Sequence, residues 1–249
     1  MKSQKGQILL ITVMLLATVM TIVLSVSFKS VTDTQVTKLE EESQKALAAA
    51  ESAIEVALRE NSSVTIGSGS LTSITGFEGT ATVESLSSTT FTTANIPKNG
   101  SYTFYLGNYD LETKIISALS SGQDITLCFK SGSAVESAVE ATVVKSNGVV
   151  KYVGDPSGRI SNASTGSCNS NTTFTKSIDI PGDVNNRFLL VRVLYASTKL
   201  FFSSSTNLPV QGRTISSQAT SNTSTGVSKK VTLFQTYPQV PGEFFTTAL

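Results

Sequence analysis

The chain has 249 residues, of which 39% are hydrophobic and 15% charged, and its 19 basic and 18 acidic side chains leave a formal net charge of +1. That balance argues against a nucleic-acid-binding protein, because such a protein needs a surplus of Lys and Arg to neutralise phosphates. With no His and two Cys, the chain cannot form Ser-His-Asp triads, Cys-His dyads or His metal ligands. The low charged fraction is typical of an extracytoplasmic surface protein rather than a cytosolic enzyme, and we expect neither catalysis nor a cofactor.

The first element is an uncharged apolar stretch. No charged residue occurs between Gln7 and Phe28, and a helix of about 22 residues spans about 33 Å, enough to cross a bilayer core of about 30 Å. The stretch is too long for a secretory signal and no small-residue cleavage site follows it, so we predict a transmembrane helix over residues 7–28. Lys2 and Lys5 precede it, which favours a cytoplasmic N-terminus with the rest of the chain outside.

Small hydroxyl side chains mark one side of this stretch. Thr18, Thr21 and Ser25 follow one another at three and four residues, so they share one face of the predicted helix. Small residues on one face allow transmembrane helices to approach each other closely. The alternative is that lipid simply tolerates Thr and Ser at these positions.

We expect the helix to continue beyond the membrane. Residues 30–60 contain no Gly and no Pro and are rich in strong helix formers. An apolar stripe with spacings of three and four is formed by Leu47, Ala50, Ile54 and Leu58. The Asn61-Ser62-Ser63 cluster predicts the end of an amphipathic extension over residues 29–61. The stripe needs a partner surface, most simply a globular domain formed by the rest of the chain.

The order of these features resembles that of type IV pilin-like proteins. A short basic leader (residues 1–6) ends in Lys5-Gly6, and the apolar helix that follows runs directly into an amphipathic one. The segment AAAESAIEVAL at residues 48–58, preceded by EEESQKAL, resembles the minor pilin group typified by the PilX N-terminal region. The resemblance covers roughly the first quarter of the chain and does not extend into the remainder.

The resemblance implies specific processing and packing residues. Prepilin peptidase would cut between Gly6 and Gln7, and Gln7 would become a new N-terminus open to N-methylation. Many pilins carry a Glu at the position of Ile11, and its carboxylate is thought to pair with a neighbour's terminal amine in the apolar filament core. Because Ile11 cannot supply that carboxylate, the resemblance favours a minor subunit over a major one. The implied partners are other pilins or pseudopilins, prepilin peptidase and inner-membrane lipid.

The rest of the chain, residues 62–249, has the composition of a β-rich domain. Ser, Thr, Gly and Asn alternate with short apolar runs, which is typical of strands separated by turns. The predicted strands are 80–86, 102–106, 125–129, 139–145, 149–153, 174–180, 188–196, 199–203 and 231–236. Asn147-Gly148 predicts a hairpin, residues 155–158 predict a turn, and residues 111–119 predict a short helix. The expected fold class is α+β, with the long helix packed on an antiparallel sheet or sandwich.

Both cysteines lie in this outer part. In an oxidising compartment Cys128 and Cys168 could form a disulfide that closes a loop of about 40 residues and contributes roughly 4 kcal/mol. Two free thiols are the alternative, with Cys128 as a small core residue. We favour the disulfide because a free thiol in the polar loop around Cys168 would be unusual.

Two other features allow a structural and a functional interpretation. Asp179, Asp183 and Asn185 could supply oxygen ligands to calcium, but they flank Pro181-Gly182, which favours a solvated turn and no metal site. The C-terminal segment with Phe244 and Phe245 predicts an extended strap that docks its aromatic rings on the domain. A partner-binding tail is the alternative.

Three classes of function remain. The first is a structural minor pilin or pseudopilin, anchored in the inner membrane with its head outside and later assembled into a surface filament. The second is an anchored surface adhesin whose β-rich head contacts a ligand. The third is an anchored hydrolase, which without His would need a Lys or a carboxylate as its base, and no motif indicates one.

Overall fold

The computed structural model describes residues 5–85, 87–119, 122–130, 135–169, 171–223 and 226–242, and the side chains only from residue 9 onward. The chain folds into two compact units. One combines the N-terminal part up to Val83 with residues 215–233, and the other combines residues 84–214 with the part from Phe234 onward. A long helix, α1, lies in the first unit and packs on β-strands, which confirms the predicted α+β class.

The helix α1 (Lys5–Glu60) runs without interruption through the predicted transmembrane and amphipathic segments. It ends where the sequence predicts, because Asn61 adopts a left-handed conformation with φ of 52°. Asn accepts this conformation more readily than most residues and often terminates a helix there. The continuity follows from composition, since no Gly or Pro occurs between Gln7 and Glu60.

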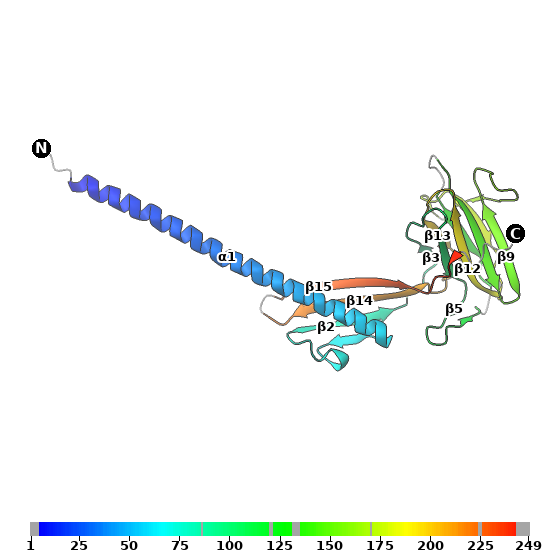
Figure 1. The fold of residues 1–249 in the computed structure, drawn as a ribbon, viewed down its shortest axis with the longest axis horizontal. Coiled ribbons are helices and arrows are strands. Elements are labelled where there is room, and N and C mark those ends of the chain that lie inside the picture. The colour runs from blue at the N-terminus through cyan, green and yellow to red at the C-terminus, as the bar shows by residue number, and fades with distance from the viewer. Residues whose placement is uncertain are drawn as a thin grey trace. The chain divides into compact units, whose positions relative to one another are not determined.

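The first unit also contains a four-stranded sheet in the order β1-β2-β14-β15. Its strands are β1 (Val64–Ile66), β2 (Phe77–Glu84), β14 (Gly212–Ser221, in this unit from Ile215) and β15 (Ser228–Thr236), with the 3-10 turn η1 (Gly69–Leu71) between the first two. The C-terminal part of α1 lies along this sheet (Figure 1). Strands far apart in sequence therefore build the surface on which the helix packs.

The helix presents mainly alanines to this sheet. The fully buried side chains of the contact face are Ala46, Ala50, Ala53 and Ala57. The predicted stripe was partly wrong: Ala50 and Ile54 are buried as expected, but Leu47 is 38% exposed. The physical reason is that the sheet approaches the helix closely enough to select its small side chains over its large ones.

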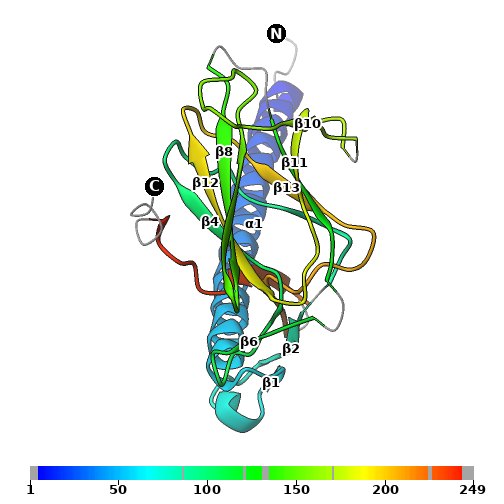
Figure 2. The ribbon, with the colours of Figure 1, turned by 90° about the vertical axis from the view of Figure 1, so that its right-hand side faces the viewer.

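The second unit is a β-sandwich of two antiparallel sheets (Figure 2). One sheet has the order β10-β11-β7-β13-β3, and the other has the order β4-β12-β8-β9. The first comprises β10 (Gly166–Ser167), β11 (Lys176–Ile180), β7 (Ile125–Phe129), β13 (Leu200–Ser203) and β3 (Thr90–Thr92). The second comprises β4 (Ser101–Tyr105), β12 (Asn186–Leu194), β8 (Ala138–Lys145) and β9 (Gly148–Gly154). A core between them includes Phe104 and Phe202, whose rings stack with centroids 4.0 Å apart.

Each of the nine predicted strands overlaps an observed one, and the predicted hairpin joins β8 to β9 with Lys145 opposite Gly148. The predicted helix over residues 111–119 was wrong. That segment forms a turn and then β6 (Ile116–Ser117), which pairs with β5 (Asn108–Tyr109). The Asp110 carboxylate accepts hydrogen bonds from the backbone N–H groups of Glu112 and Thr113, a local turn that competes with a helix.

The ten-residue strand β14 was not predicted. Its inward positions carry Ile215, Ser217, Ala219 and Ser221, all of them buried. Buried and less buried positions alternate along β14 with the period of a strand. Most of the buried positions carry small or polar residues, because the alanine face of the helix packs close to the sheet and leaves little room for larger ones. A hydrophobicity pattern is weak under those conditions.

Candidate functional site

The apolar N-terminal half of α1 is the first candidate functional surface. Within the described residues, α1 is the one helix long and apolar enough to cross a membrane, and its most apolar window has no buried residue. Every described side chain from Leu9 to Glu41 is exposed, including Leu16 at 69%. The part from Leu9 to Phe28 carries no charge, and so long an apolar surface requires lipid or other apolar helices around it, which fits anchoring by a single N-terminal span.

The threonine hydroxyls of this segment are satisfied inside the helix. Thr12 donates to the carbonyl oxygen of Leu9 at 2.9 Å, and Thr18 donates to that of Leu15 at 2.8 Å. Thr21 donates to the carbonyl oxygen of Thr18 at 2.8 Å. These bonds remove the cost of placing a hydroxyl in hydrocarbon, so they fit both tolerance in lipid and close helix packing.

The site residues predicted for the N-terminal segment belong to α1. Gly6 and Gln7 belong to its first turns, and Ile11 is 59% exposed farther along. Counted in steps of three and four, the face of Thr18 and Thr21 continues along the helix into the alanine face that packs on the sheet. Its members are Thr18, Thr21, Ser25, Phe28, Thr32, Val36, Leu39, Ser43, Ala46, Ala50, Ala53 and Ala57. The sheet covers only the C-terminal end of this face.

The first contacts of the helix with its unit begin near Glu42. The Thr223 hydroxyl, in the loop after β14, donates to the Glu42 carboxylate at 3.0 Å. One residue earlier, Glu41 pairs with Lys45 at 2.6 Å on the exposed side. The hydrogen bond and charge of Lys45 hold the pKa of the Glu41 carboxyl below its usual value. This exposed pair stabilises the helix only slightly.

The two cysteines form the predicted disulfide. The Sγ atoms of Cys128 and Cys168 are 2.09 Å apart, with their Cα atoms at 5.7 Å. Cys128 lies in β7 and is fully buried. Phe174 and Phe201 stack beside the bridge with ring centroids 5.4 Å apart. The bridge therefore fastens the loop around residue 168 to the outer face of the five-stranded sheet.

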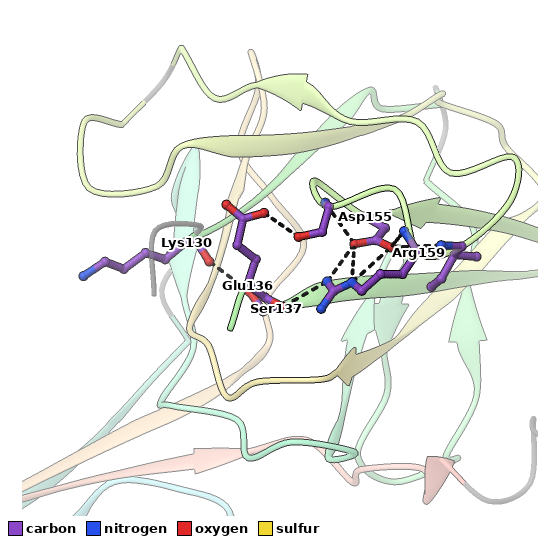
Figure 3. A network of polar contacts seen from close by, with 7 residues as sticks. Lys130, Glu136, Ser137, Asp155 and Arg159 are labelled. Atoms are coloured by element: carbon purple, nitrogen blue, oxygen red, sulfur yellow. Dashed lines mark hydrogen bonds and ion pairs between the residues drawn. The ribbon is translucent and has the colours of Figure 1, made fainter. Parts of the chain in front are cut away.

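A buried carboxylate organises the loop after β9 (Figure 3). The Asp155 side chain is fully buried and pairs with Nη2 of Arg159 at 2.7 Å. It also accepts hydrogen bonds from the backbone N–H groups of Ser157, Arg159 and Ile160. Burial raises the pKa of Asp155, but these hydrogen bonds outweigh it and leave the pKa below the usual value. The predicted turn over residues 155–158 is confirmed by the hydrogen bond from Gly158 N to Asp155 O.

Arg159 links this loop to two neighbouring segments. Its guanidinium carbon lies 3.8 Å from the centroid of the Tyr195 ring, a cation–π contact. Its Nη2 also donates to the backbone carbonyl of Glu136 at 3.0 Å. Since these interactions join chain segments to one another, we interpret the network as structural support for the loop.

The polar turn near residue 183 has its own internal partners. Oδ1 of Asp183 accepts hydrogen bonds from the backbone N–H and the side-chain amide of Asn185, and Oδ2 pairs with Lys145 at 2.9 Å. Asp179 accepts instead from the Thr126 hydroxyl at 2.9 Å. Across the described ranges, no three His, Cys, Asp or Glu side chains gather as a metal site would require. The turn interpretation is the one these contacts favour.

The C-terminal strap is described as far as Gly242, so the predicted docking of Phe244 and Phe245 lies outside the described residues. Sequence reasoning missed two other arrangements, both on the sandwich. Gln211 and Gln239 bind the edge of β4, and Lys130 and Lys199 line one pocket. Neither arrangement shows a sequence signal, because tertiary packing brings its members together.

No protein-family model, curated protein or solved structure matches this chain.

Proposed function

We propose that this chain is a minor subunit of a type IV pilus or pseudopilus. Residues 7–28 would anchor it in the inner membrane with the β-rich head outside, and α1 would later assemble it into a filament with other pilins. The observation that carries the proposal is a single unbroken helix that is wholly exposed from Leu9 to Glu41 and packed on its own sheet from Ala46 onward.

The length of the exposed segment favours assembly over simple anchoring. Residues 9–41 in a helix span about 50 Å, whereas the hydrocarbon core of a bilayer is about 30 Å thick. The part beyond the membrane still carries exposed apolar side chains at Val31, Val36 and Leu39. Neighbouring helices would cover that part, and van der Waals packing along the small-residue face would hold them together.

An anchored surface-binding module is the second candidate function. It shares the membrane helix but needs no filament, and its activity would reside in the sandwich. The observation that favours it is the two-lysine pocket on the sandwich, which the pilin proposal does not use. The two functions are compatible, since a subunit at a filament tip can also bind a ligand.

Processing tests the first candidate. The full chain is co-expressed with a prepilin peptidase, and its N-terminus is determined by mass spectrometry. We expect loss of residues 1–6, with Gln7 as the new terminus. Gly6→Val should block cleavage, whereas Ser3→Val, a matched change in the same leader, should be processed normally. A chain that still begins at Met1 beside an active peptidase would overturn the proposal.

A further inference from the structure

A pocket on the sandwich brings two lysines together at the ends of adjacent strands. It has a volume of about 320 Å³, close to the lower limit of small-ligand sites. It is lined by Asn95, Lys130, Ser137, Thr173, Phe174 and residues 196–199. Lys130 directly follows β7, and Lys199 directly precedes β13.

The pairing of the two strands brings these lysines to the same end of the sheet. Leu200 of β13 lies opposite Phe129 of β7 as the last pair of the ladder, and Lys199 and Lys130 are the next residues beyond that pair. Phe129 and Leu200 point into the sandwich core, and because side chains alternate along a strand, both lysines point to the outer face. Two ammonium groups on one face repel each other, and an anion bound between them would relieve that repulsion.

Buried hydroxyls hold the backbone of both lysines in place. The Ser137 hydroxyl donates to the carbonyl oxygen of Lys130 at 2.9 Å. The Thr198 hydroxyl accepts from the backbone N–H of Lys130 at 3.3 Å and donates to the carbonyl oxygen of Lys199 at 3.1 Å. Ser137 and Thr198 are only 3% and 4% exposed. The base of the pocket is therefore fixed by the fold.

The positive charge of the pocket is not neutralised within the described part of the chain. None of the ion pairs found there involves Lys130 or Lys199. Glu136 is close in sequence, but its carboxylate accepts from the Ser157 hydroxyl at 2.7 Å. Figure 3 shows the Lys130 side chain extending away from Glu136 and from the Asp155–Arg159 pair. The pocket therefore offers two ammonium groups to an external anion.

We propose that this pocket binds an acidic saccharide through its carboxylate. The carboxylate would lie between the ammonium groups of Lys130 and Lys199, where charge-assisted hydrogen bonds are strongest. The neutral lining favours a sugar over a bare anion, because Asn95, Thr173 and Ser197 offer hydrogen-bonding groups to ring hydroxyls. The proposal rests on the anchored-surface function only for its biological setting, since binding itself needs only the folded sandwich.

Calorimetric titration of the full chain in detergent micelles tests the proposal. The probes are a galacturonic acid disaccharide and the neutral galactose disaccharide of the same linkage. We expect the acidic sugar to bind at least about tenfold more tightly, since a hydrogen bond to a charged group contributes about that factor or more. Lys130→Ala/Lys199→Ala should lose about tenfold or more in affinity for the acidic sugar.

Two matched variants separate the pocket from general charge. Lys229→Ala/Lys230→Ala in β15 removes the same net charge elsewhere and should leave binding unchanged. Lys130→Arg/Lys199→Arg keeps both charges and should retain binding. Equal affinity for the two sugars, tighter binding of inorganic phosphate or of a phosphopeptide, or no binding of the acidic sugar would each overturn the proposal. Because binding is measured on the full chain and does not depend on its processing, failure here is distinguishable from failure of the pilin proposal.

Discussion

The side-chain amide of Gln211 pairs with both backbone polar groups of Tyr105. The Tyr105 N–H donates to Oε1 at 2.8 Å, and Nε2 donates to the Tyr105 carbonyl oxygen at 2.9 Å. Gln239 binds Thr103 in a similar way, since the Thr103 N–H donates to Oε1 of Gln239 at 2.8 Å. The backbone N–H and carbonyl groups of Tyr105 and Thr103 in β4 point away from β12, toward the edge of their sheet. Exposed edges are templates for unwanted strand pairing, so two glutamines take the place of a neighbouring strand.

Removing the Gln211 amide should therefore be costly. Gln211→Ala leaves the Tyr105 N–H and carbonyl buried without partners, and we expect a loss of about 2–3 kcal/mol in unfolding free energy. Chemical denaturation measures it. Gln218→Ala, at an exposed position of β14, is the matched control and should change stability by less than about 0.5 kcal/mol. Equal losses in the two variants would contradict the edge-capping role.

Reduction of the disulfide should destabilise the sandwich. The bridge joins residues separated by 40 positions, a loop for which chain entropy predicts a contribution of roughly 4 kcal/mol. We expect a reducing agent to lower the melting temperature of the wild-type chain and to leave that of Cys128→Ala/Cys168→Ala unchanged. A positive free-thiol assay on the native, unreduced protein would rule out the bridge.

The Asp155 carboxylate should give the chain an acid-dependent stability. Its pKa in the folded protein is below the usual value, so the unfolded chain takes up the proton first as the pH falls. The stabilisation is complete above the unfolded pKa of about 4 and is lost as the pH falls toward the folded pKa. Asp155→Asn should lose about 3 kcal/mol at pH 7 and show a weaker acid dependence.

Denaturant titrations between pH 2 and pH 7 measure this dependence. The control is Asp33→Asn, which removes a carboxylate from the exposed part of α1 and should leave the wild-type profile intact. If Asp155→Asn and the wild type lost stability in parallel as the pH fell, the hydrogen-bonded carboxylate could not be the source of the acid sensitivity.

The alanine face of α1 should not accept larger side chains. Ala53 is fully buried against the sheet, and Ala53→Leu should cost about 1–3 kcal/mol through overpacking. Ala48→Leu is the matched control. Ala48 lies in the same part of α1 but is exposed, and Leu is nearly as good a helix former as Ala. Thermal unfolding compares them. Equal melting temperatures would show that the sheet tolerates a wider separation from the helix.

The sequence alone determined the helices and strands that are specified by residues close together in the chain. The uncharged run after Gly6 and the absence of Gly and Pro before Asn61 specify one continuous helix, and apolar runs bounded by turn residues indicate the strands. The disulfide was also accessible, because only two cysteines are present. These features depend on neighbours in the chain, so patterns of spacing and composition are enough to predict them.

Only the tertiary structure decided which segments of the chain contact one another. Strand β14 is poor in large apolar residues because alanines of α1 occupy the space above it, and Leu47 is exposed for the same reason. Gln211 binds Tyr105, and Lys130 and Lys199 line one pocket, although each of these two sets joins segments more than sixty residues apart. The sequence gives each residue's chemical type directly. Which residue it contacts depends on packing and strand register, and these depend on the whole chain.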